Sequence, residues 1–156
     1  MTKRSYFELS QCILSYHDWM KVDGLWDLLP NYQKFLTNKE HWQIIINTWS
    51  KSEHNSEPHN REKWQDILNM RKPIKFFKKN LKKTNKVYRA GSSNGFSWTL
   101  NKTKALEFQK RYNSFNPIYY SSSKVKIELI SKIVNYDEVK FYNNLRDEEE
   151  VVLIID

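Results

Sequence analysis

Hydrophobic side chains recur at helical spacing through the first half of the chain. Their spacing predicts a helix over residues 5–20, followed by a break at Asp23 and Gly24. A short helix over residues 25–29 is expected to end at Pro30, because a proline disfavours helical backbone in the residue before it. The chain is therefore expected to open with helices that each bury one apolar face.

Capping residues mark further helix starts. Thr37 or Asn38 can cap a helix that carries tryptophan and isoleucine residues at helical spacing. Asn60 can cap the next helix, and Pro73 is suited to the first turn of another. Lysines are expected to cover the solvent side of this last helix, at Lys75, Lys78, Lys79, Lys82 and Lys83.

Strand-like runs replace this pattern in the second half. Apolar runs begin at Val87 and Phe96, and Asn101 can cap a helix after them. Further strands are predicted over residues 125–129, 132–134, 139–142 and 151–155. Helices followed by strands are typical of an α+β fold. We expect a helical N-terminal region over residues 1–85 and a β-rich core over residues 86–156. The two regions are expected to pack together into one compact unit.

Composition indicates a folded intracellular protein. The 156 residues suit one domain, and a 15% share of aromatic residues argues against disorder. Cys12 is the single cysteine, so no internal disulfide forms, which fits a reducing cytosol. No run is long enough for a membrane span, and the four histidines lack metal-ligand spacing. We expect a cytoplasmic protein that binds no metal and no membrane.

Charge is distributed unevenly along the chain, whose formal net charge is +8. Residues 71–112 hold 13 Lys or Arg and one acid, whereas residues 137–156 hold seven acids and two basic residues. A basic segment attracts phosphate groups, whether of a dinucleotide or a nucleic acid, and it also attracts acidic partners. A solvated basic face is the equally weighted alternative.

Five polar residues of the second half form a candidate site. Arg89 lies inside an apolar run, where a partly buried guanidinium needs an anion or several acceptors. Ser97 and Thr99 are two residues apart, so they share one face of a strand. Glu150 stands at the head of the last apolar run. Glu148 lies two residues before it, on the same side if the backbone there is extended. The structural alternatives are an ion pair for the arginine, ordinary strand hydroxyls, and a charged turn.

The order of these residues on three predicted strands resembles the arginine–serine–glutamate type of the ADP-ribosyltransferase superfamily. The resemblance covers residues 86–156, and the run Gly-Phe-Ser-Trp-Thr is similar to that of small phage and prophage proteins. It implies an ADP-ribosyltransferase-like mixed β-sheet core. It also implies that Arg89 holds the phosphate and ribose of NAD, and that Ser97 and Thr99 shape the nicotinamide pocket. Glu150 corresponds to the catalytic residue, and Glu148 to the acid that precedes it.

An aromatic ring is expected to stack on the nicotinamide, and the candidates are Tyr88, Phe96 and Phe108. Two positions depart from the family pattern. Ala90 stands where a glycine usually follows the arginine, and Leu100 replaces the third residue of the second motif. These departures favour a protein that keeps the fold but binds without turnover.

The resemblance implies transfer of ADP-ribose from NAD, as substrate, to a macromolecule. A protein acceptor, such as a host or defence factor in the bacterial cytoplasm, is favoured over a nucleic acid. Two alternatives stay open: modification of nucleic acid or plain hydrolysis of NAD, and a non-catalytic binding protein that inhibits a host factor by contact. The acceptor, the oligomeric state and the role of the helical region are left open.

Overall fold

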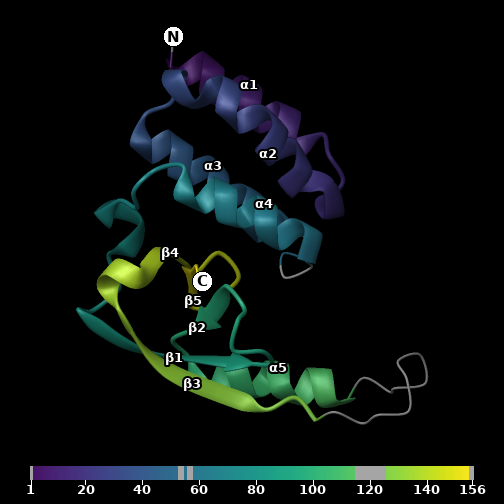
Figure 1. Cartoon of the computed structure of the whole chain (residues 1–156), viewed down its shortest axis with the longest axis vertical. Helices are drawn as coiled ribbons and strands as arrows, with labels where there is room; N and C mark the ends of the chain where they lie inside the picture. Colours follow the sequence, from purple (N-terminus) through teal and green to yellow (C-terminus); the bar gives the residue numbers. More distant parts are fainter. Residues whose placement is uncertain (1, 53–54, 56–57, 115–125, 155–156) are drawn as a thin grey trace. The chain divides into compact units, whose positions relative to one another are not determined.

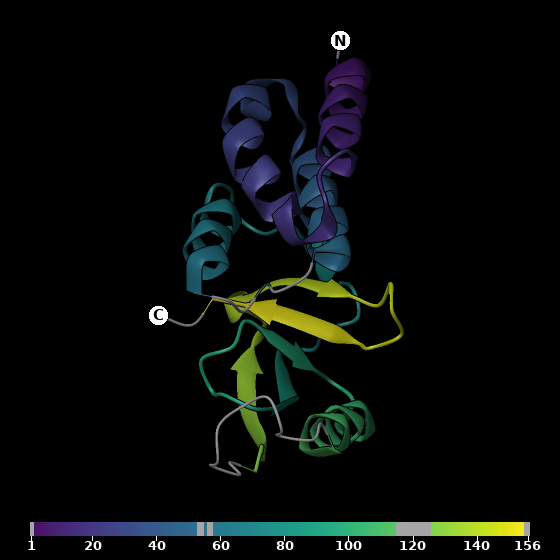
Figure 2. The ribbon, with the colours of Figure 1, turned by 90° about the vertical axis from the view of Figure 1, so that its right-hand side faces the viewer.

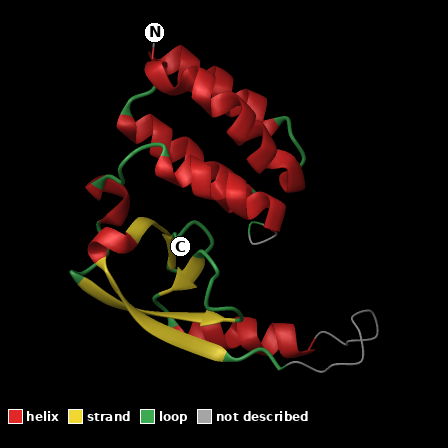
Figure 3. Cartoon of the chain, viewed as in Figure 1, coloured by secondary structure: helices red, strands yellow, loops and turns green. Residues whose placement is uncertain are grey.

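Five α-helices and a five-stranded sheet form the described part of the computed structural model, which covers residues 2–52, 55, 58–114 and 126–154 (Figure 3). The expected α+β class is thereby confirmed. The chain divides into two compact units, residues 1–79 and residues 80–156, and each is described by itself (Figure 1). The boundary expected from the sequence lies after residue 85.

The helical unit contains α1 (Thr2–Leu14), α2 (Lys21–Tyr32), α3 (Asn38–Lys51) and α4 (Pro58–Asn69). Helix α2 packs against the other three helices, so it is the central one. Each buried apolar side chain stabilises such a core by about 1.5–3 kcal/mol. The largest buried side chains of this core are Leu9, Leu25, Leu29, Trp42, Ile45, Trp49, Trp64, Ile67 and Leu68.

The helix break expected around Gly24 and the helix end expected at Pro30 are both wrong, because α2 runs through these residues. Gly24 leaves room for Tyr16, since a Cβ at this position would lie 2.8 Å from the tyrosine ring. Leu25 and Leu29 are fully buried one helical turn apart. Their burial offsets the cost of a helical glycine, about 1 kcal/mol, and of a helical proline, about 3 kcal/mol.

The cap predicted at Thr37 is confirmed. The Thr37 hydroxyl accepts the N–H of Glu40 at 3.2 Å, and Oε2 of Glu40 accepts the N–H of Thr37 at 2.8 Å. This capping box satisfies two donors at the start of α3. The cap predicted at Asn60 is wrong, because α4 begins earlier, at Pro58. A first-turn proline lacks only an N–H that has no partner within the helix.

The helix predicted from Pro73 is also wrong, since only a short 3₁₀ helix over Lys75–Lys78 forms in this segment. The expected solvated surface of five lysines needs one correction. Lys78 is 4% exposed, whereas Lys79, like the other three lysines, is exposed. The segment therefore turns one of its lysines inward.

The sheet unit contains the strands β1 (Thr84–Ala90), β2 (Ser97–Thr99), β3 (Leu129–Asn135), β4 (Val139–Asn143) and β5 (Glu150–Leu153) (Figure 2). Their order across the sheet is β3-β1-β2-β5-β4, and all neighbours are antiparallel, so the expectation of a mixed sheet is wrong for the described strands. The strand predicted over residues 125–129 begins only at its last residue. Val125 and Ile155, at the ends of two predicted strands, lie outside the described residues.

One face of the sheet carries the apolar core of this unit. Val87, Trp98, Val134, Val139, Val151 and Leu153 form that buried cluster. Helix α5 (Lys102–Ser114) packs against β1, β2 and β3. Its predicted cap is confirmed, because Oδ1 of Asn101 accepts the N–H of Lys104 at 3.2 Å.

Candidate functional site

Three adjacent strands bring together residues that are far apart in the chain. The sheet order makes β2 the neighbour of both β1 and β5. Tyr88 on β1 pairs with Thr99 on β2, which in turn pairs with Glu150 on β5. Paired residues project from the same face of a sheet, so these side chains form one row, and Ser97 lies on the same face. We call this the site face.

A hydroxyl and an amide hold the carboxylate at the centre of the site face. The Ser97 hydroxyl donates to Oε1 of Glu150 at 2.5 Å, and Nδ2 of Asn143 donates to Oε2 at 3.2 Å. Glu150 is 4% exposed, so protein donors replace much of the water around its carboxylate. Both carboxylate oxygens are therefore fixed in direction.

Asn143 is a member of the site that the sequence did not indicate. It pairs with Glu150 across β4 and β5, and its Oδ1 accepts the N–H of Leu145 at 3.0 Å. This second bond fixes which end of the amide points at the carboxylate. Consecutive asparagines at the end of a strand are a signal for a turn, and Asn143 and Asn144 predict the hairpin but not the contact.

The hairpin between β4 and β5 holds Glu148 in a strained turn. Asp147 and Glu149 on either side have φ angles of 55° and 46°, in a left-handed conformation that costs about 1–2 kcal/mol for residues other than glycine. Thr99 Oγ1 donates to the Glu148 carbonyl at 2.6 Å, and Asn144 Oδ1 accepts the N–H of Glu149 at 2.9 Å. Thr99 therefore contributes by anchoring the turn that carries the second acid.

The carboxyl group of Glu148 has a raised pKa. Burial is the largest cause, the Arg146 guanidinium at 3.6 Å opposes it, and the Glu150 carboxylate raises the pKa further. A carboxyl group with a raised pKa is better matched to proton transfer near neutral pH than an ordinary one. The two acids of the site thus differ in environment, one held by neutral donors and the other beside a cation.

Arg89 holds the loop between β1 and β2. Its Nε donates to the carbonyl of Ser92 at 2.8 Å, and its Nη1 donates to the carbonyl of Ser97 at 2.6 Å. The guanidinium lies against Gly95, where a Cβ would overlap it. Alternation along β1 starts the Arg89 side chain on the opposite face from the site face. Arg89 thus donates a hydrogen bond to the backbone carbonyl of Ser97, while the hydroxyl of Ser97 donates one to Glu150.

The three aromatic candidates differ in their settings. Tyr88 is half-buried and lies on the site face. Phe96 is buried just before β2, and its carbonyl accepts the N–H of Leu153 at 2.9 Å. Phe108 is half-buried on α5 and stacks on Tyr112 at a centroid distance of 6.5 Å. Tyr88 is therefore the best placed of the three to contact a ligand at Glu150.

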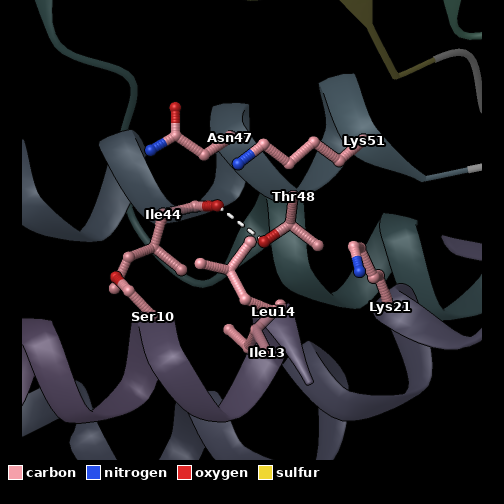
Figure 4. Close-up of a pocket in the computed structure, with 8 residues that line it drawn as sticks. All are labelled: Ser10, Ile13, Leu14, Lys21, Ile44, Asn47, Thr48 and Lys51. Carbon is pink, nitrogen blue, oxygen red and sulfur yellow. Dashed lines mark hydrogen bonds between the residues drawn. The ribbon is translucent and has the colours of Figure 1, made fainter. Parts of the chain in front are cut away.

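A small hollow lies in the helical unit and draws no residue from the sheet. Its lining comes mainly from α1 and α3, where the Thr48 hydroxyl donates to the Ile44 carbonyl at 2.8 Å (Figure 4). No group of His, Cys, Asp and Glu side chains suited to a metal ion occurs among the described residues. None of the described helices has the length and hydrophobicity needed to cross a bilayer.

No family model matches the chain, and no curated protein or solved structure shows significant similarity to it. Function is therefore inferred from the chemistry of the site face.

Proposed function

We propose that the protein transfers ADP-ribose from NAD to a macromolecular acceptor, with Glu150 as the catalytic carboxylate. The observation that carries the proposal is the 2.5 Å hydrogen bond from the Ser97 hydroxyl to Glu150. Support also comes from the neighbouring positions of β1, β2 and β5, which hold the arginine, hydroxyl and acid motifs on adjacent strands. A carboxylate fixed by two donors suits a reaction that develops positive charge.

The bond to be broken joins the ribose C1 of NAD to the nicotinamide nitrogen. Nicotinamide leaves with the electron pair, and positive charge develops on the ribose as in glycoside cleavage. The Glu150 carboxylate stabilises this charge, while Ser97 and Asn143 keep its oxygens in place. Arg89 is proposed to bind a phosphate of NAD, and Tyr88, on the site face, to contact the nicotinamide.

Glu148 is proposed to act on the acceptor. As a nucleophile of the acceptor bonds to ribose C1, its proton has to be removed, and a carboxylate with a raised pKa can take it. Thr99 anchors the backbone of the turn that carries Glu148 through a hydrogen bond to its carbonyl. A protein side chain is the favoured acceptor, and nucleic acid or water is the alternative.

A second function, binding without turnover, is favoured by two observations. Glu150 is 4% exposed, which leaves little of its carboxylate open to a substrate. The Arg89 guanidinium is engaged with the carbonyls of Ser92 and Ser97, and these bonds compete with a phosphate. Such a protein would inhibit a host or defence factor through its surface.

One experiment separates these functions. The purified full chain is incubated with NAD labelled in the ADP-ribose part, with and without a bacterial lysate, and Glu150→Gln is run alongside. Label on protein that is lost in the variant supports the proposal. Label on nucleic acid, or free ADP-ribose alone, reassigns the acceptor. No product at any enzyme concentration overturns catalysis and supports the binding protein.

A further inference from the structure

Five exposed lysines and two exposed aromatic rings gather on one part of the helical unit. They come from the segment between α2 and α3 together with the start of α3, and from the segment after α4 (left side of Figure 1). Residues 33–39 and 70–79 contain seven Lys or Arg and no Asp or Glu. We call the exposed set the cationic aromatic surface, and its members are Lys34, Phe35, Lys39, Lys72, Lys75, Phe76 and Lys79.

The aromatic rings of this surface lie in the open beside ammonium groups. Phe35 and Phe76 are 42% and 43% exposed. The ammonium of Lys39 lies 4.1 Å and that of Lys79 lies 4.2 Å from the centroid of the Phe76 ring, and Lys34 lies 4.9 Å from that of Phe35. Such exposed contacts contribute only about 0.5–1 kcal/mol each, so a stronger anion can displace them.

Arg71 and Trp42 fix the two segments against each other. Arg71 Nε donates to Oε1 of Gln33 at 2.9 Å, and Nη1 donates to the Leu36 carbonyl at 3.1 Å and to Oδ1 of Asn38 at 3.0 Å. Trp42 Nε1 donates to the carbonyl of Lys72 at 3.0 Å. The surface lysines therefore project from a backbone that is already ordered, which lowers the entropy cost of binding.

None of the five surface ammonium groups forms an ion pair with another residue in the described part of the chain. Ammonium groups that lack an acidic partner among the described residues, and that lie beside exposed rings, fit a ligand with repeated anions and flat apolar groups. Single-stranded nucleic acid has both, since its phosphates bind lysines and its unpaired bases stack on aromatic rings. A duplex hides its base faces, and an acidic protein segment uses the lysines but not the rings.

We propose that the cationic aromatic surface binds single-stranded nucleic acid without regard to sequence. On binding, the Lys39 and Lys79 ammonium groups exchange the Phe76 ring for phosphates, and a base stacks on the vacated ring face. The proposal is independent of ADP-ribosyl transfer, because it involves no residue of the site face. It also gives the basic segment a role that does not require NAD.

The test measures fluorescence anisotropy of a labelled strand of about 12 thymidines, within the site sizes of single-strand binders, at salt concentrations between about 50 and 200 mM. Lys39→Gln/Lys79→Gln should reduce the slope of log K against log salt by about 1.4, because each lost phosphate contact removes about 0.7 for single strands. Lys102→Gln/Lys110→Gln, on exposed positions of α5, removes the same charge and should leave the slope nearly unchanged.

Variants at Phe76 test the stacking step. Phe76→Leu should weaken binding by about tenfold, whereas Phe76→Tyr keeps a ring and should bind like the parent. Circular dichroism melting checks that each variant is folded. The proposal is overturned if the α5 control loses as much binding as the surface variant, or if Phe76→Leu has no effect. Tighter binding of a duplex, or stronger competition by polyglutamate than by the strand, also overturns it.

Discussion

Ser97 and Glu150, which are 53 residues apart in the chain, meet side chain to side chain at 2.5 Å across β2 and β5. The hydroxyl belongs to the first residue of β2, and the carboxylate belongs to the first residue of β5. The contact is supported by a second donor, Asn143, from the strand on the far side. Burying a carboxylate costs free energy, which hydrogen bonds from these two donors offset. The carboxylate is thereby held in one orientation, and this makes Glu150 the first residue to test.

Glu150→Gln should reduce NAD turnover by about 100-fold or more, the scale of a lost electrostatic stabiliser. The amide keeps the size of the side chain but not the charge that opposes the ribose cation. Nicotinamide release measures the effect.

Glu128→Gln is the matched control, since Glu128 is exposed and precedes β3. It should turn over NAD at the parental rate. If Glu150→Gln does so as well, Glu150 is not the catalytic residue.

Glu148→Gln should separate transfer from hydrolysis. Loss of the base is expected to slow transfer to the acceptor by about 100-fold, while hydrolysis of NAD by water persists. Burial raises the pKa of Glu148, so the acidic limb of the transfer rate should lie above the usual carboxyl value of 4.5. Initial rates of both reactions across pH test this, and an equal fall of both would remove the role.

The same pKa direction has a consequence for stability. A carboxyl whose pKa is higher in the folded state contributes stability at low pH, and this contribution is lost as pH rises from 4.5 through the raised value. Glu148→Gln stays uncharged throughout. The variant should therefore unfold at a higher denaturant concentration than the parent near neutral pH, and no difference at any pH would contradict the assigned shift.

Arg89→Lys should weaken NAD binding, because a point charge replaces a guanidinium that can hold a phosphate with two bonds. It should also lower the free energy of unfolding by about 1–3 kcal/mol, since the carbonyls of Ser92 and Ser97 lose their donors. Calorimetry with NAD and thermal melting measure the two effects separately.

Gly95→Ala gives the matched comparison for Arg89, because its added Cβ displaces the guanidinium without removing it. The variant should lose stability like Arg89→Lys. If Arg89→Lys melts early but binds NAD as tightly as the parent, Arg89 is a residue of the loop and not of the ligand site.

His41 should make the helical unit sensitive to acid. The residue is 0% exposed, and neither ring nitrogen has a hydrogen-bond partner among the described residues. Burial, and then the charge of Arg71, lowers its pKa from 6.5 to about 4. The stability gained from the neutral ring is fully present above pH 6.5 and is lost as pH falls toward about 4, by about 3 kcal/mol in total.

His41→Leu should remove this slope, because the variant has no proton to bind at that position. His17→Gln, which changes an exposed histidine, should keep it. Denaturant unfolding at several pH values between about 4 and 7 makes the comparison. A parent whose stability is flat across this range would contradict the assigned shift.

The features that the sequence predicts well are those decided locally. The Thr37 capping box joins residues three apart, and the Asn101 cap is equally local, so the residue types are sufficient to find both. The placement of Ser97, Thr99 and Glu150 at strand ends follows from apolar runs next to polar residues. These features are determined by residues that are close together in the chain.

The features that the sequence misses depend on distant packing. Helix α2 continues through Gly24 and Pro30 because buried leucines outweigh the local preference. Lys78 turns inward, and Asn143 joins the site only through the pairing of β4 with β5. The left-handed turn at Asp147 and Glu149 is equally hidden, since a glutamate rarely adopts a positive φ.

The sheet order also predicts the order in which parts of the chain fold. Strand β2 has three residues and lies between β1, its near neighbour in the chain, and β5, which is far away. Pairing of strands that are distant in the chain is slow, because closing the intervening loop costs conformational entropy before the strand contacts form. The helical unit should thus be complete while the site face is still open, and Ser97 and Glu150 should meet in the last kinetic phase of refolding.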